Sequence, residues 1–314
     1  MSNEGSGAAT ARELESTLGA AGYRSRLVPV HVMEEAERVI AGLREQGVVA
    51  QGLYDAYAAS LRFVSPLEVP EPKTMVVVAW ASPAVKVRFH MGTGPLEAII
   101  PPTYISSARR ARCLEIIRSV LGPRGHSVAR APGPVKLLAV RAGLARYGRN
   151  NLAYVPGMGS YTCLDAFCTD ADLQAQEHTG KGSMLMSCCP PCRNCHHVCP
   201  TGCIPHAGTV IDAERCLTYF NESEGEFPDW LDPAAHGCLV GCMRCQEMCP
   251  ANRYYLRNEP LVAEFSREET AVILEDRPPE GLPEPLRAKL RRLDLEEYSA
   301  VLGRNLLALS NASR

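Results

Sequence analysis

The chain has 314 residues, 46% of them hydrophobic, so it can bury a substantial core and is expected to form two domains. Its formal net charge of −2 disfavours a dedicated nucleic-acid binder, which usually carries a strongly basic domain. There is no run of about 18 apolar residues and no resemblance to a signal peptide at the N-terminus, so we expect a cytoplasmic protein without a membrane span.

The N-terminal part reads as a short disordered tail at residues 1–10 followed by helices and a strand. Thr10 and Glu13 form a capping-box pair ahead of an apolar helical pattern that Gly22 ends, which predicts a helix over residues 11–21. The stretch from Tyr23 to Val30 suggests a strand. Two more helices are expected, over residues 33–43 and 53–61.

A continuous β-branched run from Lys73 to Ala81 predicts a central strand that is covered on both faces. Residues 83–104 are rich in Gly and Pro and are expected to form a loop. Beyond them we expect helices from Ser106 or Ser107 to Leu121 and from Pro134 to Tyr147, then strands over residues 152–155 and 160–168. Together these elements predict a layered α/β or α+β domain at residues 11–175.

Seven of the fourteen cysteines lie in two motifs that follow this domain. The first is Cys189-x2-Cys192-x2-Cys195-x3-Cys199-Pro, and the second is Cys242-x2-Cys245-x3-Cys249-Pro. This spacing is typical of bacterial ferredoxins, in which three cysteines bind one [4Fe-4S] cluster and the fourth binds the other. Zinc usually takes two separated pairs, and disulfides need an oxidising compartment. The motifs therefore predict two [4Fe-4S] clusters in a domain at residues 176–258.

The ferredoxin rule assigns most of the ligands. Cluster 1 takes the first three cysteines of the first motif and the last of the second: Cys189, Cys192, Cys195 and Cys249. Cluster 2 takes Cys199, Cys242 and Cys245, and it needs one further thiolate. Cys216 is the preferred fourth ligand, and Cys238 is its rival. Residues 259–314 are expected to form helices that pack back on the first domain, with a capping box at Ser266 and Glu269.

A bare two-cluster ferredoxin needs only about 60 residues, so the large domain in front requires another explanation. Six segments carry a resemblance to a known family, and they occur in this order: Ala142-Gly143-Leu144, Tyr147-Gly148-Arg149-Asn150-Asn151-Leu152, Gly159-Ser160, the first cysteine motif with Thr201-Gly202, Ala213-Glu214-Arg215-Cys216, and Cys242-Met243-Arg244-Cys245-Gln246. In these segments the chain resembles the epoxyqueuosine reductases and the related reductive dehalogenases.

The resemblance implies an α+β protein with a nitroreductase-like cobalamin-binding domain, a ferredoxin-type domain with two [4Fe-4S] clusters, and C-terminal helices. In such proteins the clusters pass electrons to the corrin cobalt, which reduces the substrate. The candidate cobalamin-binding residues are Tyr104, Gly143, Asn150, Gly159 and Ser160. No Asp-x-His-x-x-Gly motif is present, so the cobalamin is expected in a base-off state. A flavin is the alternative occupant of this domain.

A proton donor is also required, and here the chain departs from the family. Epoxyqueuosine reductases carry an aspartate where the alignment on Ala142 places Ala129. We therefore expect a small or nucleoside-like substrate and a low-potential donor such as a ferredoxin or flavodoxin, with tRNA a disfavoured partner. Tyr147 and Arg149 are the candidate catalytic pair, with the guanidinium favouring phenolate. The other proton-donor candidates are Tyr104, Tyr154 and His90. The alternative function is a non-catalytic electron-transfer protein or a reductive activator of a corrinoid protein.

Overall fold

The computed structural model describes residues 4–49, 51–55, 64–92, 94–131, 133–176, 184–255 and 259–312. The chain forms two compact units. Unit 1 comprises Met1–Ala81 and Ser107–Pro191, and unit 2 comprises Ser82–Ser106 and Cys192–Arg314. Residues 82–106, which we expected inside the first domain, therefore belong to the same unit as most of the cysteine motifs.

Unit 1 is built on a four-stranded antiparallel sheet in the order β1-β2-β8-β5. Its strands are β1 (Tyr23–Pro29), β2 (Thr74–Ala81), β5 (Val128–Arg130) and β8 (Thr162–Thr169). The predicted central strand is confirmed, because β2 lies between β1 and β8 and is buried from Thr74 to Trp80.

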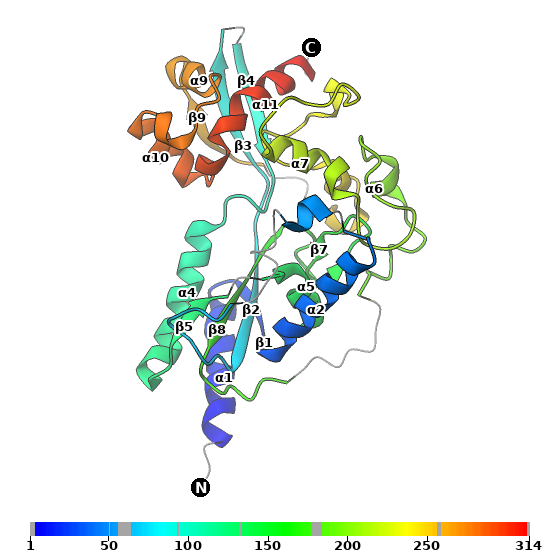
Figure 1. Cartoon of the computed structure of the whole chain (residues 1–314). Coiled ribbons are helices and arrows are strands. Elements are labelled where there is room, and N and C mark those ends of the chain that lie inside the picture. The colour runs from blue at the N-terminus through cyan, green and yellow to red at the C-terminus, as the bar shows by residue number, and fades with distance from the viewer. Residues whose placement is uncertain are drawn as a thin grey trace. The chain divides into compact units, whose positions relative to one another are not determined.

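Alternate residues of β2 point to opposite faces of the sheet, and each face has its own helical layer (Figure 1). Val76, Val78 and Trp80 pack with residues of α1 (Glu4–Ala20) and α4 (Ser107–Leu121). Met75, Val77 and Ala79 pack with residues of α2 (His31–Glu45) and α5 (Val135–Arg141). Two apolar faces explain why this strand has no polar alternation.

Two helix predictions need correction, and a third lies only partly within the described residues. The first helix begins at Glu4, so Thr10 lies inside it and the predicted capping box is wrong. The helix predicted to reach Tyr147 ends at Arg141, because Gly143 adopts the left-handed conformation with φ +69° that commonly terminates helices. Residues 51–55 are helical, and the rest of the helix expected over 53–61 lies outside the described residues.

The loop predicted over residues 83–104 is also wrong. These residues contain strands β3 (Val85–Met91) and β4 (Gly94–Ile100), which pair antiparallel. A third strand, β9 (Leu261–Phe265), joins β3 in parallel to give the order β4-β3-β9 in unit 2. The side chains of Phe89 and Phe265 stack across this pair with ring centroids 4.6 Å apart.

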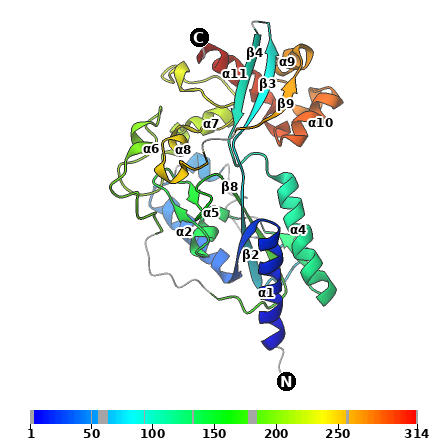
Figure 2. The same ribbon diagram turned by 180° about the vertical axis from the view of Figure 1, so that it is seen from behind.

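The C-terminal helices pack on this small sheet within unit 2 (Figure 2). They are α9 (Arg267–Ile273), α10 (Glu284–Arg292) and α11 (Ser299–Ala312). Leu286 and Leu290 of α10 and Leu302 and Leu306 of α11 share one apolar core with Phe89. The spacing of four residues within each helix places both of its leucines on one face.

The remaining elements are short. They are β6 (Arg146–Tyr147), β7 (Ala153–Tyr154), α6 (Asn194–His197), α7 (Leu217–Glu222) and α8 (Arg244–Glu247), with 3-10 turns at Gly122–Arg124, Ala213–Arg215, Pro233–Ala235, Pro250–Asn252, Pro279–Gly281 and Glu296–Tyr298. In the described parts of the chain, no helix combines the length and apolar character that a bilayer span requires.

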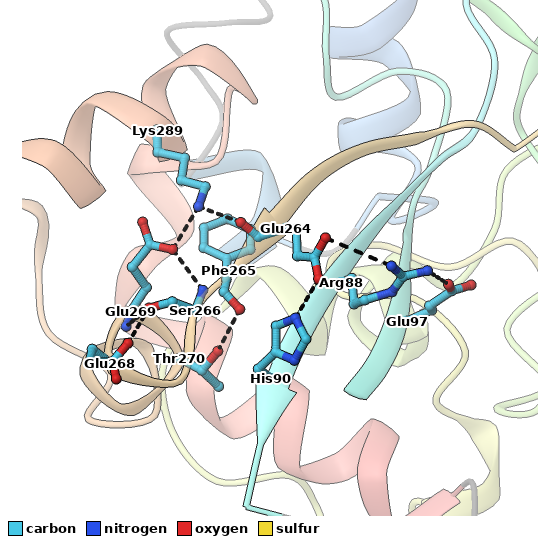
Figure 3. Close-up of polar contacts among 10 residues, drawn as sticks. All are labelled: Arg88, His90, Glu97, Glu264, Phe265, Ser266, Glu268, Glu269, Thr270 and Lys289. Atoms are coloured by element: carbon cyan, nitrogen blue, oxygen red, sulfur yellow. Dashed lines mark hydrogen bonds and ion pairs between the residues drawn. The ribbon is translucent and has the colours of Figure 1, made fainter. Parts of the chain in front are cut away.

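The predicted capping box at the start of α9 is confirmed (Figure 3). The backbone N–H of Glu269 donates to the Ser266 Oγ at 3.2 Å, and the Ser266 N–H donates to the Glu269 carboxylate at 2.8 Å. Lys289 of α10 also donates to this carboxylate at 2.6 Å. The cap thus joins β9, α9 and α10.

Replacing Ser266 with alanine is expected to lower the free energy of unfolding by about 1 kcal/mol, because the Glu269 N–H loses its capping acceptor. Ser266→Asp is the matched control, since aspartate is an equally good N-cap. Urea unfolding at equal iron content would measure both variants. An equal loss in the two would contradict a capping role for the hydroxyl.

Candidate functional site

The parts of the two cysteine motifs that lie in unit 2 fold alike. In each motif the cysteine before the Cys-Pro step, Cys195 or Cys245, lies in a four-residue helix, α6 or α8, and the Cys-Pro step begins four residues later. The Asn194 side chain of the first motif donates to the carbonyl of Met248 in the second at 3.3 Å. Residues about 50 positions apart in the sequence are thereby held together, as the reciprocal ferredoxin pattern requires.

A group of sulfur atoms gathers around the Cys199 end of the first motif. Cys199 Sγ lies 3.4 Å from Cys203 Sγ and 3.6 Å from the hydroxyl oxygen of Thr201. Cys203 also shares a hydrogen bond with Cys216. A backbone hydrogen bond of 2.9 Å from the Asp212 N–H to the Cys203 carbonyl closes the intervening loop and brings Cys216 to this group.

These contacts shift the pKa values of the thiols. The hydrogen bond with Cys203 lowers the pKa of Cys199 to about 5 and that of Cys216 to about 7, in both cases against the opposing effect of burial. The same sharing raises the pKa of Cys203. Burial, followed by the nearby charges of Cys216 and Cys199, raises the pKa of Cys242 to about 12. Cys199, Cys216 and Cys242 thus lie within electrostatic reach of one another.

Both rivals for the fourth ligand of cluster 2 interact electrostatically with a predicted ligand of that cluster. Cys216 interacts electrostatically with both Cys199 and Cys242, which are two of the predicted ligands. Cys238 is 2% exposed, and burial, followed by the charge of Cys242, raises its pKa well above the usual range. The contacts of Cys216 with two predicted ligands support it as the preferred fourth ligand, and the assignment stays a prediction.

The remaining cysteines fall into two groups. All fourteen are free thiols, and Cys113, Cys163 and Cys168 are buried in the core of unit 1. Cys188 is exposed, whereas its neighbour Cys189 is buried at the C-terminal end of unit 1. In the described residues, no three Cys, His, Asp or Glu side chains converge as closely as a single bound ion requires. Individual cluster ligands are therefore proposed from the motif spacing and the sulfur contacts.

The Gly-Arg-Asn segment forms a hairpin whose strands β6 and β7 pair through Tyr147 and Ala153. The Tyr147 backbone continues the ladder to the segment before the first motif: its N–H donates to Met184 at 2.7 Å, and its carbonyl accepts from Met186 at 2.8 Å. The Cys189 N–H then donates to the Met186 carbonyl at 3.0 Å. The hairpin thus fixes the entry to the first cysteine motif.

Arg149 makes the closest side-chain link between the hairpin and this motif. Its side chain is 4% exposed in unit 1, and its Nη2 donates to the carbonyls of Cys189 at 2.8 Å and Pro190 at 3.4 Å. Burial raises the pKa of Tyr147 to about 12, which is opposite to the lowering expected from a neighbouring guanidinium. Tyr147 is therefore a neutral phenol at neutral pH.

Replacing Arg149 with alanine is expected to destabilise the Cys189 backbone by about 2 kcal/mol, a typical value for a hydrogen bond to a charged donor, and to lower iron incorporation. The exposed Arg146 on the same hairpin provides the matched control, Arg146→Ala. Iron content per chain and urea unfolding would measure both effects. Equal iron content and stability in the two variants would contradict this positioning role.

Other predicted residues of unit 1 lie in turns and a cavity. Asn150 Nδ2 donates to the Tyr154 hydroxyl at 3.0 Å, and both side chains are buried. Gly159, with φ +60°, closes a turn with Val155, and the adjoining Ser160 is 4% exposed. Gly143 lines a cavity of about 460 Å³ whose other lining residues are Glu15, Tyr23, Arg24, Ser25, Arg26, Leu144 and Pro156.

Two predicted residues belong to unit 2. Tyr104 packs edge-on against Tyr298, and its hydroxyl donates to the Glu222 carboxylate, so burial and this carboxylate raise its pKa well above 10. His90 on β3 pairs with Glu264 on β9 (Figure 3). The sequence alone could not predict that Glu222 contacts Tyr104, because the two residues are 118 positions apart.

Residues 188–252 match a family model described as a 4Fe-4S double cluster binding domain. Epoxyqueuosine reductase from Escherichia coli is 36% identical over 125 residues, which are 40% of this chain and 31% of that protein. The match therefore spans about a third of the curated relative.

Two solved structures share the fold. Epoxyqueuosine reductase from Streptococcus thermophilus aligns with a TM-score of 0.67 at 18% identity, covering 96% of this chain and 81% of the other. An epoxyqueuosine reductase with an epoxyqueuosine-modified tRNA-Tyr stem loop aligns at 0.62 with 16% identity, covering 96% and 82%. In sequence over part of its length and in fold over nearly all of it, the chain is similar to the epoxyqueuosine reductases.

Proposed function

We propose that the protein is an iron–sulfur oxidoreductase that uses two [4Fe-4S] clusters to reduce a small or nucleoside-like substrate through a corrinoid. The observation that carries this proposal is the double-cluster domain at residues 188–252 within a fold shared with reductases. Cluster 1 would be held by Cys189, Cys192, Cys195 and Cys249. Cluster 2 would be held by Cys199, Cys216, Cys242 and Cys245. Thiolate is the usual ligand of such clusters, so the donor set fits.

A bound corrinoid would supply a cobalt that can be reduced to a strong nucleophile or one-electron donor. The cavity at Gly143, of about 460 Å³, lies in the range of small-molecule sites and is large enough for part of such a cofactor. Gly159, Ser160 and Asn150 of unit 1 are proposed as further contacts, whereas the predicted contact Tyr104 belongs to unit 2. A flavin is the competing occupant.

The chain has Ala129 where the epoxyqueuosine reductases have an aspartate, and this difference bears on which substrate it could reduce. Ala129 lies in β5, paired with Cys168 and 5% exposed in the core of unit 1, so this position offers no proton. Tyr147, a protonated phenol at neutral pH, is the proposed donor. One relative binds an epoxyqueuosine-modified tRNA stem loop, but Ala129 makes a tRNA substrate disfavoured for this chain.

Ala129 also favours a second candidate function. A chain without the aspartate could serve as an electron-transfer protein or as a reductive activator of a corrinoid protein. In either function the clusters would take electrons from a low-potential donor such as a ferredoxin or flavodoxin. Turnover with candidate acceptors distinguishes the two functions, since only the reductase converts a small substrate repeatedly.

The first test is anaerobic expression with added cobalamin, followed by iron, sulfide and cobalt analysis. About eight irons and one cobalt per chain are expected. The EPR spectrum of the Co(II) form should lack nitrogen superhyperfine splitting, because a base-off cobalamin without a histidine ligand is proposed. About eight irons without cobalt, even after reconstitution, would overturn the corrinoid assignment and leave an electron-transfer protein or a flavoprotein.

A further inference from the structure

Eight proposed ligands leave six of the fourteen cysteines without a role in the clusters. They are Cys113, Cys163, Cys168, Cys188, Cys203 and Cys238. Within this set, Cys203 is distinguished by contacts with two proposed ligands of one cluster. Its Sγ lies 3.4 Å from Cys199 Sγ, and it shares a hydrogen bond with Cys216. All three residues belong to unit 2.

The local chain path explains this placement. The Gly202 N–H donates to the Cys199 carbonyl at 3.2 Å, and Gly202 has φ +64°, a left-handed conformation that suits glycine. This tight turn folds residue 203 back over residue 199. Cys203 is 4% exposed, so its thiol faces the protein interior and the two ligand sulfurs rather than water.

The 3.4 Å sulfur separation also argues against Cys203 as a ligand in its own right. Two cysteines bound to different irons of one cubane cluster are held farther apart than two sulfurs in van der Waals contact. Cys199 occupies the Cys-Pro position of the ferredoxin motif, which supplies the crossing ligand. A neighbour this close to Cys199 therefore has no separate iron to bind. The separation also exceeds the roughly 2.05 Å of a disulfide, so both sulfurs are free.

We propose that Cys203 is a positioning residue for cluster 2, whose thiol donates an S–H···S hydrogen bond to the ligand sulfur of Cys199 or Cys216. Hydrogen bonds to cluster sulfurs withdraw electron density and favour the reduced state, so they raise the reduction potential. Cluster 2 would thus be a better electron acceptor than it would be without this hydrogen bond. This inference rests on the proposed two-cluster function and adds a residue that raises the potential of one cluster.

The experiment compares the wild-type protein with Cys203→Ala and Cys203→Ser by iron analysis and EPR-monitored redox titration. Wild type and both variants are expected to hold about eight irons. In Cys203→Ala the midpoint potential of one cluster should shift to a more negative value while the other stays in place. In Cys203→Ser the hydroxyl retains a donor and should keep the potential closer to wild type. Cys168→Ala, a buried cysteine of unit 1, should change neither potential.

Three results would overturn the proposal in distinguishable ways. Loss of irons in Cys203→Ala would make Cys203 a ligand rather than a donor. Full iron content with unchanged potentials in Cys203→Ala would show that the thiol only packs against its neighbours. A wild-type protein without about eight irons would remove the two-cluster function itself, and the inference with it.

Discussion

Replacing Cys216 with alanine is expected to disrupt one of the two clusters, whereas replacing Cys238 should leave both intact. Cys216 interacts electrostatically with the cluster 2 ligands Cys199 and Cys242, and it shares a hydrogen bond with Cys203 beside them. Without its fourth thiolate, a [4Fe-4S] cluster loses the iron that this thiolate binds. Iron should therefore fall from about eight per chain to about seven if a [3Fe-4S] form survives, or to about four if the cluster is lost.

Anaerobic purification with iron and sulfide analysis measures the loss, and EPR of the oxidised protein detects any [3Fe-4S] cluster. Cys238→Ala is the matched control, because both residues lie in unit 2 and outside the two motifs. Some loss of stability is expected in this control, because Cys238 is 2% exposed. Loss of iron in Cys238→Ala and full iron in Cys216→Ala would reverse the assignment.

The cysteine motifs could be recognised from the sequence because their information is local. Three residues between Cys195 and Cys199 and a following proline fix one helical turn, and the same step recurs at Cys245 and Cys249. The position of Cys203 could not be predicted in this way. It depends on the left-handed turn at Gly202 and on the hydrogen bond from Asp212, which no spacing rule describes.

The hairpin β3–β4 shows a different limit. Val85, Val87 and Phe89 alternate with more exposed residues, so the period of two that marks a strand was present. The Gly and Pro content of the region outweighed this pattern in the prediction of a loop. The parallel pairing of β3 with β9 was out of reach, because it joins residues about 170 positions apart in the sequence.

The helix predicted up to Tyr147 failed for a related reason. Its apolar pattern continues past Arg141, but the left-handed Gly143 ends α5, and Tyr147 instead pairs with Ala153 and with the segment at Met184. Tyr147 makes hydrogen bonds to Met184 and Met186, which lie about 40 positions away in the sequence. The local sequence therefore could not predict that Tyr147 lies in a strand. Tertiary contacts override local propensity there.

Replacing Asp165 with asparagine is expected to destabilise unit 1 by about 3 kcal/mol. The Asp165 side chain is fully buried in the middle of β8. Arg110 of α4 donates to one carboxylate oxygen, and Arg130 Nε lies 3.0 Å and 3.1 Å from the two oxygens. An asparagine would present a neutral amide to two guanidinium groups, so both would lose their countercharge.

The partial exposure of the two arginines sets the size of this effect. The side chains of Arg110 and Arg130 are 30% and 53% exposed, so water compensates part of their lost pairing and the cost should lie at the low end of the range for broken buried pairs. Arg112→Ala, which breaks the exposed pair with Glu115 on α4, is the control and should cost less than about 0.5 kcal/mol. Urea unfolding of both variants at equal iron content measures the difference. A similar small loss in both would show that hydration, rather than Asp165, balances these arginines.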